Sequence, residues 1–242
     1  MALDEVLLTT LSAPVVRVYE WQPHTITLGY AQRAADVDRA ACERWGLDVT
    51  RRLTGGRAVL HADELTYSVI APPDLVGGLR NLTRSYQLIS GCLATALRAA
   101  GLAIEFSERP TAPAARLGAH DPACFAASLG GDLVVSGRKL VGSAQLQRLG
   151  GVLQHGSLPR TLDHRPLDEC LRRPAGAQHN WTSLSDLGVG LSPLRFAQLM
   201  GEAYAELFGA LTEPQEPTAD EWAAARALAA EKYATDAWIE RL

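Results

Sequence analysis

Short stretches with the residue pattern of β-strands, separated by turns, constrain the fold of this chain more than any other feature. In residues 64–69, Leu65, Tyr67 and Val69 share one face and polar side chains share the other, as in a β-strand. Apolar runs on both sides of Ser136-Gly137-Arg138 predict a hairpin. Further strands are predicted at 15–28 (two strands or one kinked strand), 48–52, 58–61 and 151–158.

Predicted helices fall between these strands at irregular intervals. In residues 81–100, apolar side chains recur at three- and four-residue steps, the spacing of a helix packed on a core. Asp36 is expected to cap a helix that runs to about Trp45, and Ser192-Pro193 to begin another. Residues 219–242 are predicted to form one alanine-rich helix. This order predicts an α+β fold, with a mixed, mostly antiparallel sheet and flanking helices.

The length and charge of the chain limit its organisation and its partners. A chain of 242 residues can bury a substantial core, and we expect one main domain over residues 1–211. Residues 212–242 are expected to be a linker and a C-terminal helix that packs on that domain. The net charge of -4 disfavours nucleic acid as a partner.

The cysteines and the N-terminus indicate a cytoplasmic protein. No two of the four cysteines form a Cys-x-x-Cys pair, which disfavours a zinc ribbon and a thioredoxin-type redox site and fits a reducing compartment. The first residues lack the pattern of a signal peptide, and no apolar run approaches the roughly 20 residues that a membrane-spanning helix needs. We therefore expect no membrane attachment.

Cys124 and Lys139 are the candidate catalytic pair. Cys124 follows a proline-rich stretch, and Lys139 begins a predicted strand between Gly137 and Gly142. A neighbouring ammonium stabilises a thiolate and lowers a thiol pKa that is otherwise about 8.5, so the pair suggests acyl-transfer chemistry. The alternative is a small buried cysteine and a solvated lysine that never meet.

A second candidate region surrounds the paired glycines Gly55 and Gly56. Glycines expose backbone N–H groups, and the neighbouring arginines supply cationic groups suited to phosphate or carboxylate. The order of residues is neither a P-loop nor a dinucleotide fingerprint, and a plain turn between strands is the alternative. The substrate-binding residues predicted here are Arg51, Arg52, Thr54, Gly55, Gly56, Arg57, Ala58 and His61.

A third set of candidates follows Lys139. His61 and His155 each stand beside glycine-containing segments and have side chains that can orient a substrate or carry a proton, although a lone histidine is more often structural. The predicted substrate-binding residues here are Gly142, Ser143, Ala144, His155 and Gly156. The other histidines lack ligand spacing, so neither a metal site nor a cofactor is predicted.

Several of these segments resemble the biotin/lipoate protein ligase superfamily. The resemblance is carried by the stretch from Arg51 to His61, by Glu64-Leu65-Thr66-Tyr67-Ser68, by Gly137-Arg138-Lys139, and by Gln154-His155-Gly156-Ser157. It implies a biotin/lipoate protein ligase-like catalytic domain. Within the superfamily, Ala123-Cys124-Phe125 upstream of Gly137-Arg138-Lys139 resembles the octanoyltransferases of the LipM type.

This resemblance implies an octanoyl-[acyl carrier protein]:protein N-octanoyltransferase, with Cys124 as the nucleophile that forms an acyl thioester and Lys139 as its activator. The implied donor is octanoyl-acyl carrier protein. The implied acceptors are the lipoyl domains of 2-oxoacid dehydrogenase E2 subunits or the glycine cleavage H protein, and no ATP is consumed. Two alternatives stay open: an ATP-dependent lipoate-protein ligase, in which Cys124 is incidental, and a non-catalytic module that binds acyl groups or carrier proteins.

Overall fold

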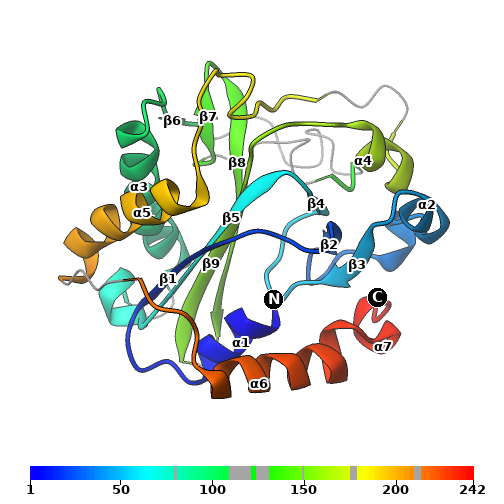
Figure 1. Ribbon diagram of the computed structural model, residues 1–242, viewed down its shortest axis with the longest axis horizontal. Helices are drawn as coiled ribbons and strands as arrows, with labels where there is room; N and C mark the ends of the chain where they lie inside the picture. The colour runs from blue at the N-terminus through cyan, green and yellow to red at the C-terminus, as the bar shows by residue number, and fades with distance from the viewer. Residues whose placement is uncertain (79–80, 109–120, 124–130, 149, 175–178, 210–213) are drawn as a thin grey trace.

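A computed structural model of the protein describes residues 1–78, 81–108, 121–123, 131–148, 150–174, 179–209 and 214–242. Its larger sheet has six strands, and each pairs antiparallel with its neighbours (Figure 1). The α+β fold with a mostly antiparallel sheet is thus confirmed. In spatial order the strands are β1 (Val15–Tyr19), β5 (Glu64–Ala71), β9 (Gly151–Pro159), β8 (Arg138–Arg148), β7 (Leu133–Val135) and β6 (Glu105–Phe106).

A smaller sheet of three strands lies beside one end of the larger sheet (Figure 1). Its central strand β2 (Thr25–Leu28) runs parallel to β3 (Asp48–Arg51) and antiparallel to β4 (Val59–His61). The predicted strand region 15–28 is therefore two strands, and the chain passes from one sheet to the other between them.

Two long helices cover one face of the larger sheet. α3 (Leu82–Ala99) is capped by Asn81, and α5 (Pro193–Phe208) by Ser192, as the sequence predicted for its start. The two helices pack together, and the hydroxyl of Tyr204 donates to the carbonyl oxygen of Ile89 at 2.6 Å. Their apolar faces bury the main core of the protein against β5, β8 and β9.

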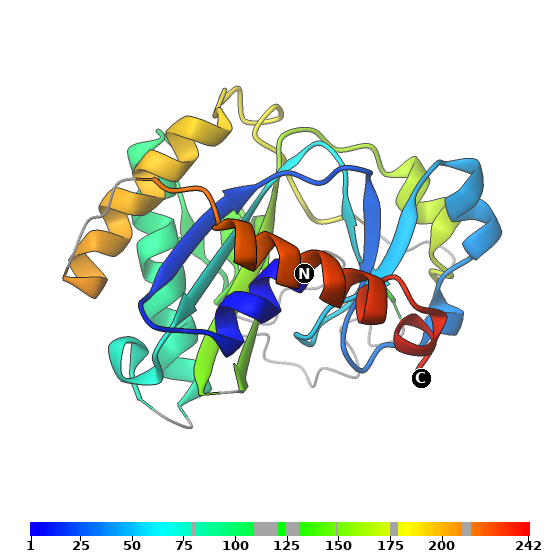
Figure 2. The same cartoon turned by 60° about the horizontal axis from the view of Figure 1, so that its bottom comes forward.

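The opposite face of the sheet carries a helix that the sequence did not predict. α1 (Ala2–Thr9) packs on β5 and β9, and α6 (Ala219–Leu228) crosses it on the outside (Figure 2). Glu5 of α1 binds Lys232 at 2.7 Å and accepts a hydrogen bond from Tyr233 at 2.7 Å. The prediction of one continuous helix at 219–242 is wrong, because a π-helical turn (Ala229–Tyr233) and a short helix α7 (Asp236–Ile239) follow α6.

A further prediction of local structure is corrected. α2 (Arg39–Arg44) is capped by Asp38, whose side chain accepts from the N–H of Ala41 at 2.9 Å, and not by Asp36. Asp36 instead closes a short 3-10 helix, η1 (Ala34–Asp36). α4 (Arg165–Cys170) is another short helix that the sequence did not predict. A second 3-10 helix, η2 (Pro73–Val76), follows β5.

The alternation predicted for β5 is present, but both of its faces are buried. Leu65, Tyr67 and Val69 belong to the main core under α3 and α5. The polar residues Glu64, Thr66 and Ser68 face the other way and are also inaccessible. The polar face of β5 is therefore the wall of an interior polar region between the two sheets and not a solvent surface. Among the described residues, no helix has the length and apolar character that spanning a membrane requires.

Candidate active site

A narrow cavity lies between the two sheets and contains many of the predicted substrate-binding residues. It is bounded by β2 and β4 of the small sheet and by β5, β8 and β9 of the large one. Its volume is about 20 Å³, which is room for about one water molecule. The predicted residues that line it are Arg52, His61, Gly142, Ser143, Ala144, His155 and Gly156.

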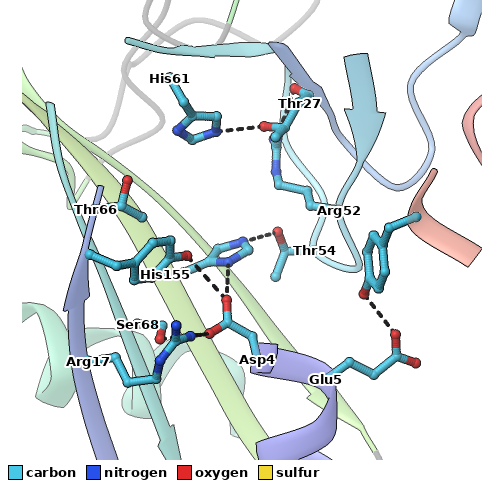
Figure 3. Close-up of polar contacts among 12 residues, drawn as sticks. Asp4, Glu5, Arg17, Thr27, Arg52, Thr54, His61, Thr66, Ser68 and His155 are labelled. Atoms are coloured by element: carbon cyan, nitrogen blue, oxygen red, sulfur yellow. Dashed lines mark hydrogen bonds and ion pairs between the residues drawn. The ribbon is translucent and has the colours of Figure 1, made fainter. Parts of the chain in front are cut away.

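His155 is held in this cavity by a buried carboxylate of α1. Its Nδ1 lies 3.6 Å from Asp4 Oδ2, and its Nε2 lies 2.6 Å from Thr54 Oγ1 (Figure 3). Asp4 also forms an ion pair with Arg17, accepts from Ser68 Oγ at 2.9 Å, and accepts from the Tyr19 hydroxyl at 3.3 Å.

The charge states within this network follow from burial and pairing. Burial alone would raise the pKa of Asp4, but the Arg17 guanidinium and the bond from His155 outweigh it and lower that pKa. Burial lowers the pKa of His155, and it outweighs the opposite effect of Asp4. His155 is therefore neutral at neutral pH. With its proton on Nδ1, toward Asp4, its Nε2 accepts the hydroxyl proton of Thr54.

His61 is fixed in the same way on the opposite side of the cavity. Its Nδ1 lies 2.6 Å from Glu64 Oε1, and its Nε2 lies 2.9 Å from Thr27 Oγ1. The indole of Trp21 stacks on the imidazole with 4.2 Å between ring centroids. Both nitrogen atoms of His61 thus have protein partners, and its ring presents a fixed wall to the cavity.

The two adjacent arginines Arg51 and Arg52 have different surroundings. Arg51 is fully buried and donates to backbone carbonyls, including Gly29 at 2.8 Å and Ile239 at 2.5 Å, so it connects the C-terminal segment to the loop after β2. Arg52 lines the cavity, and it donates to Thr27 O at 2.9 Å and to Gly55 O at 2.9 Å. Arg51 is not among the residues that line the cavity.

The glycine loop after β3 depends on a close backbone approach. A Cβ atom at Gly29 would lie 1.9 Å from the carbonyl oxygen of Gly56, and Gly56 itself has a φ of +90°. Both positions therefore require glycine. Arg57, which follows, has a buried guanidinium nitrogen, Nη1, with no hydrogen-bond partner among the described residues. Gly55 is exposed at the tip of the loop.

Lys139 is buried at the start of β8 and forms an ion pair. Its Nζ lies 3.0 Å from Asp132 Oδ2, and both side chains are nearly inaccessible. Its backbone pairs in parallel with Trp181, so that the N–H of Lys139 donates to Asn180 O at 3.0 Å. A lysine predicted at the start of a hairpin strand is therefore an interior cation with a counter-charge.

Cys124 lies outside the described residues, and so its predicted proximity to Lys139 stays a prediction. The chain that leads to it is described as far as Ala123. Ala123 pairs in parallel with Ala58, and the N–H of Ala58 donates to Pro122 O at 2.8 Å. This pairing joins the residue before Cys124 to the start of β4, the strand whose Val59 and His61 line the cavity.

A second, larger cavity adjoins the two segments that contain Ala58 and Trp181. Its volume is about 290 Å³, and Ala58 and Trp181 both line it. It shares Val59 and Ser157 with the narrow cavity, so the two hollows lie next to each other between the sheets. Among the described residues, no cluster of His, Cys, Asp and Glu is arranged to hold a metal ion.

Several residues of the site were missed in the sequence. Asp4 was the most important, and its position gave a signal: Leu7 and Leu8 follow it at helical spacing, so an acid stands on the apolar face of α1. Thr27, Glu64 and Asp132 gave no comparable signal, because each is a single polar residue in a strand or turn.

Comparison with known proteins identifies relatives of this chain. Residues 1–205 match the family model of the lipoyl protein ligase A/B catalytic domain. The chain is 39% identical over 257 residues to octanoyltransferase LipM of Kyrpidia tusciae, covering all of this chain and 93% of that relative. It is 37% identical over 256 residues to octanoyltransferase LipM of an Exiguobacterium species, covering 99% and 92%.

Solved structures share the fold. A lipoate-protein ligase A bound with ATP aligns with a TM-score of 0.81 at 22% identity, covering all of this chain and 93% of that one. A bi-partite lipoate protein ligase from Thermoplasma acidophilum aligns with a TM-score of 0.78 at 21% identity, covering all of this chain and 91% of that one.

Proposed function

This chain belongs to the family of lipoyl protein ligase A/B catalytic domains, and we propose that it carries out octanoyl transfer in protein lipoylation through an acyl-enzyme on Cys124. The protein is an acyltransferase, because relatives of 37–39% identity over nearly the whole chain are octanoyltransferases. The resemblance found in the sequence is thereby confirmed at the level of the family and its activity.

The structural observation that carries the proposed mechanism is the pairing of Ala58 with Ala123. It joins the residue before Cys124 to the strand that borders both cavities. We propose that Cys124, the next residue in the chain, enters the adjacent hollow, whose walls include fixed histidines, small side chains and glycines. Lys139 reaches the same region through the pairing of its backbone with Trp181, which lines the larger cavity.

The proposed reaction has two steps. In the first, the Cys124 thiolate attacks the thioester carbonyl of octanoyl-acyl carrier protein, a new C–S bond forms, and the carrier leaves as a thiol after it takes a proton. In the second, the deprotonated amine of a lipoyl-domain lysine attacks the acyl-enzyme, an amide bond forms, and Cys124 is released. Neither step requires ATP.

Lys139 is proposed to stabilise negative charge in both steps. The Nζ atom of Lys139 forms an ion pair with Asp132 at 3.0 Å. The ion pair fixes the position of Nζ, so the cation is in place before the reaction begins. A fixed donor directed at a developing oxyanion contributes about 10²-fold or more in rate.

The cavity between the sheets is proposed to receive the acyl chain. At about 20 Å³ it does not hold eight carbons as it stands, so side chains that line it must move when the chain enters. His61 has hydrogen-bond partners at both nitrogens, His155 is held through its Nε2 by Thr54, and the walls from β8 and β9 are small: Gly142, Ala144 and Gly156. Arg57, with its buried Nη1, is proposed to bind the carrier's phosphate or an acidic partner surface.

Intact-protein mass spectrometry after mixing with octanoyl-acyl carrier protein, without ATP, tests the proposal. We expect an octanoyl adduct that hydroxylamine removes and that Cys124→Ser abolishes. Cys92→Ser is the matched control, because Cys92 is a partly accessible thiol on α3 and should leave the adduct intact. Transfer to a lipoyl domain that requires ATP and free octanoate, and that survives Cys124→Ser, would instead identify a ligase.

A further inference from the structure

A buried ion pair outside the cavity joins Asp121 to Arg173. The Nε atom of Arg173 lies 3.0 Å from Oδ1 and 3.2 Å from Oδ2 of Asp121, and its Nη2 atom lies 2.9 Å from Oδ2. The side chains of Arg173 and Asp121 are 5% and 6% exposed, respectively. A guanidinium that binds both oxygens of one carboxylate fixes its orientation as well as its position.

Asp121 also fixes the backbone that follows it. Its Oδ1 accepts from the N–H of Ala123 at 3.0 Å. The carbonyl oxygen of Pro122 accepts from the N–H of Ala58 at 2.8 Å and from Gln32 Nε2 at 3.1 Å. All three residues before Cys124 thus have hydrogen bonds, and those of Asp121 and Pro122 reach Arg173, Ala58 and Gln32 in other parts of the protein.

Arg173 also has contacts on its other side. Its Nη1 atom binds the exposed carboxylate of Asp168 on α4 and lies 3.2 Å from His179 Nδ1. The chain just before it is paired with the segment before α2, through Leu171 and Val37. The ion pair therefore connects the segment that enters the site to a second packed part of the structure.

We propose that Arg173 and Asp121 form a positioning ion pair that sets where Cys124 enters the active site. The inference rests on the proposed role of Cys124 as nucleophile. Because Asp121 binds the amide of Ala123, a shift of the carboxylate moves the residue that precedes the thiol. Misplacement of a reacting group by about 1 Å costs about 10²-fold in rate.

The test compares the acylation step in four variants. Asp121→Asn and Arg173→Met each break the pair, and Arg173→Lys keeps the positive charge without the planar guanidinium. Asp168→Asn removes only the exposed partner of Arg173, because the Asp168 side chain is 44% exposed. Rapid-quench mass spectrometry gives the rate constant for thioester formation and the carrier concentration at half saturation, and melting temperature reports folding.

We expect Asp121→Asn and Arg173→Met to lower the acylation rate constant about 100-fold with little change in half-saturating carrier concentration. Arg173→Lys should lose about tenfold, and Asp168→Asn less than twofold. If Asp121→Asn and Arg173→Met do not fold, the acylation rate constants of Arg173→Lys and Asp168→Asn still test the inference. Full-rate acylation by folded Asp121→Asn, or equal rates in Arg173→Lys and Asp168→Asn, would overturn the inference.

Hydrogen exchange separates this inference from the proposed function. The amide of Ala123 should exchange at least tenfold faster in Asp121→Asn and Arg173→Met than in Asp168→Asn. If the unaltered protein forms no thioester on Cys124, the proposed function fails, and unchanged exchange at Ala123 would show separately that the ion pair does not hold this segment.

Discussion

The cavity between the sheets and the region around Lys139 are held together by different forces. The histidines of the cavity are fixed by hydrogen bonds, and His155 is kept neutral by burial. Around Lys139 and in the segment before Cys124, full charges are paired: Lys139 with Asp132, and Arg173 with Asp121. The glycines and small side chains of the cavity suit an apolar acyl chain, whereas balanced charges suit a place where negative charge develops and disappears.

The largest expected effect comes from removing the positive charge of Lys139. Lys139→Met should lower octanoyl transfer by about 10²-fold or more, because no ammonium then stabilises the oxyanion. It should also destabilise the fold by about 3–5 kcal/mol, since the buried Asp132 carboxylate then loses its lysine counter-charge. Steady-state transfer to a lipoyl domain and thermal unfolding measure the two effects.

Lys139→Met combined with Asp132→Asn is the matched control for folding. The double variant removes the uncompensated charge and should recover much of the stability but none of the rate. Recovery of the rate as well would mean that Lys139 acts on the structure alone.

A smaller effect is expected when the cavity wall is thickened. A Cβ at Gly156 would lie 2.6 Å from the Tyr67 ring and 2.7 Å from the carbonyl oxygen of Gly142. Gly156→Ala should therefore cost about 1–3 kcal/mol of stability by overpacking, and it should weaken use of octanoyl donors more than of acetyl donors. Comparison of transfer rates with the two donors gives the answer.

Gly91→Ala in α3 is the control for this substitution. A Cβ there meets nothing within 4 Å, and alanine favours a helix over glycine by about 0.5–1 kcal/mol. It should stabilise the protein without changing donor preference. If Gly156→Ala behaved like Gly91→Ala, the acyl chain would not lie against β9.

The shifted pKa values of Asp4 and His155 also predict how the free energy of unfolding depends on pH. The pKa of Asp4 is lowered by Arg17 and His155 despite burial. The ionised carboxylate therefore stabilises the fold at pH values above the pKa of Asp4 in the unfolded chain, and this stabilisation is lost as the pH falls below it. The pKa of His155 is lowered by burial, so the unfolded state binds a proton before the folded state does below about pH 6.5. Both groups act in the same direction.

Stability should therefore fall in two stages on acidification, first below about pH 6.5 as His155 of the unfolded state binds a proton, and again below about pH 4 as Asp4 does. Urea unfolding at a series of pH values from 7 to 3 measures both stages. Asp4→Asn should make the protein less stable at pH 7 and flatten the stage below about pH 4. A stability that rises on acidification, or a slope below about pH 4 that Asp4→Asn leaves unchanged, would contradict the assignment of charge states in the cavity.

The smallest effect is expected at Ser143, which lines the cavity without a charged partner. Its Oγ lies 2.8 Å from the Tyr67 hydroxyl, which Gln154 also binds at 3.0 Å. Ser143→Ala should cost about 1 kcal/mol of stability and change the transfer rate less than about threefold. Loss of the thioester adduct in this variant would show that the hydroxyl takes part in the chemistry.

The sequence was most informative where a local pattern has one tertiary meaning. Repeated apolar spacing located α3 and α5, and turn residues located the β7–β8 hairpin. The pattern was less informative at the ends of helices, where Asp36 and Asp38 are both acceptable caps and only packing selects one. It failed for residues 219–242, because alanine-rich spacing does not reveal that Tyr233 must turn inward to Glu5.

For the site, the sequence identified residues by chemistry but did not distinguish their roles. Arg51 and Arg52 are identical side chains one position apart, yet Arg51 binds the carbonyls of the C-terminal segment and Arg52 lines the cavity. The alternation of a strand predicts that they face opposite ways, but not what lies on each side. Asp4 was missed because its partners are far away in the chain: Ser68 lies 64 residues later.

By itself, the sequence determined the family, most of the strands, the long helices α3 and α5, and the residue types able to carry acyl transfer, because these depend on local spacing and on motifs. The tertiary structure decided which polar residues are buried together. Asp4, Ser68 and His155 come from one helix and two strands and meet only when β5 pairs with β9 and α1 packs across them. Their charge states follow from that meeting, since burial and pairing shift a pKa and neither is a property of the residue alone.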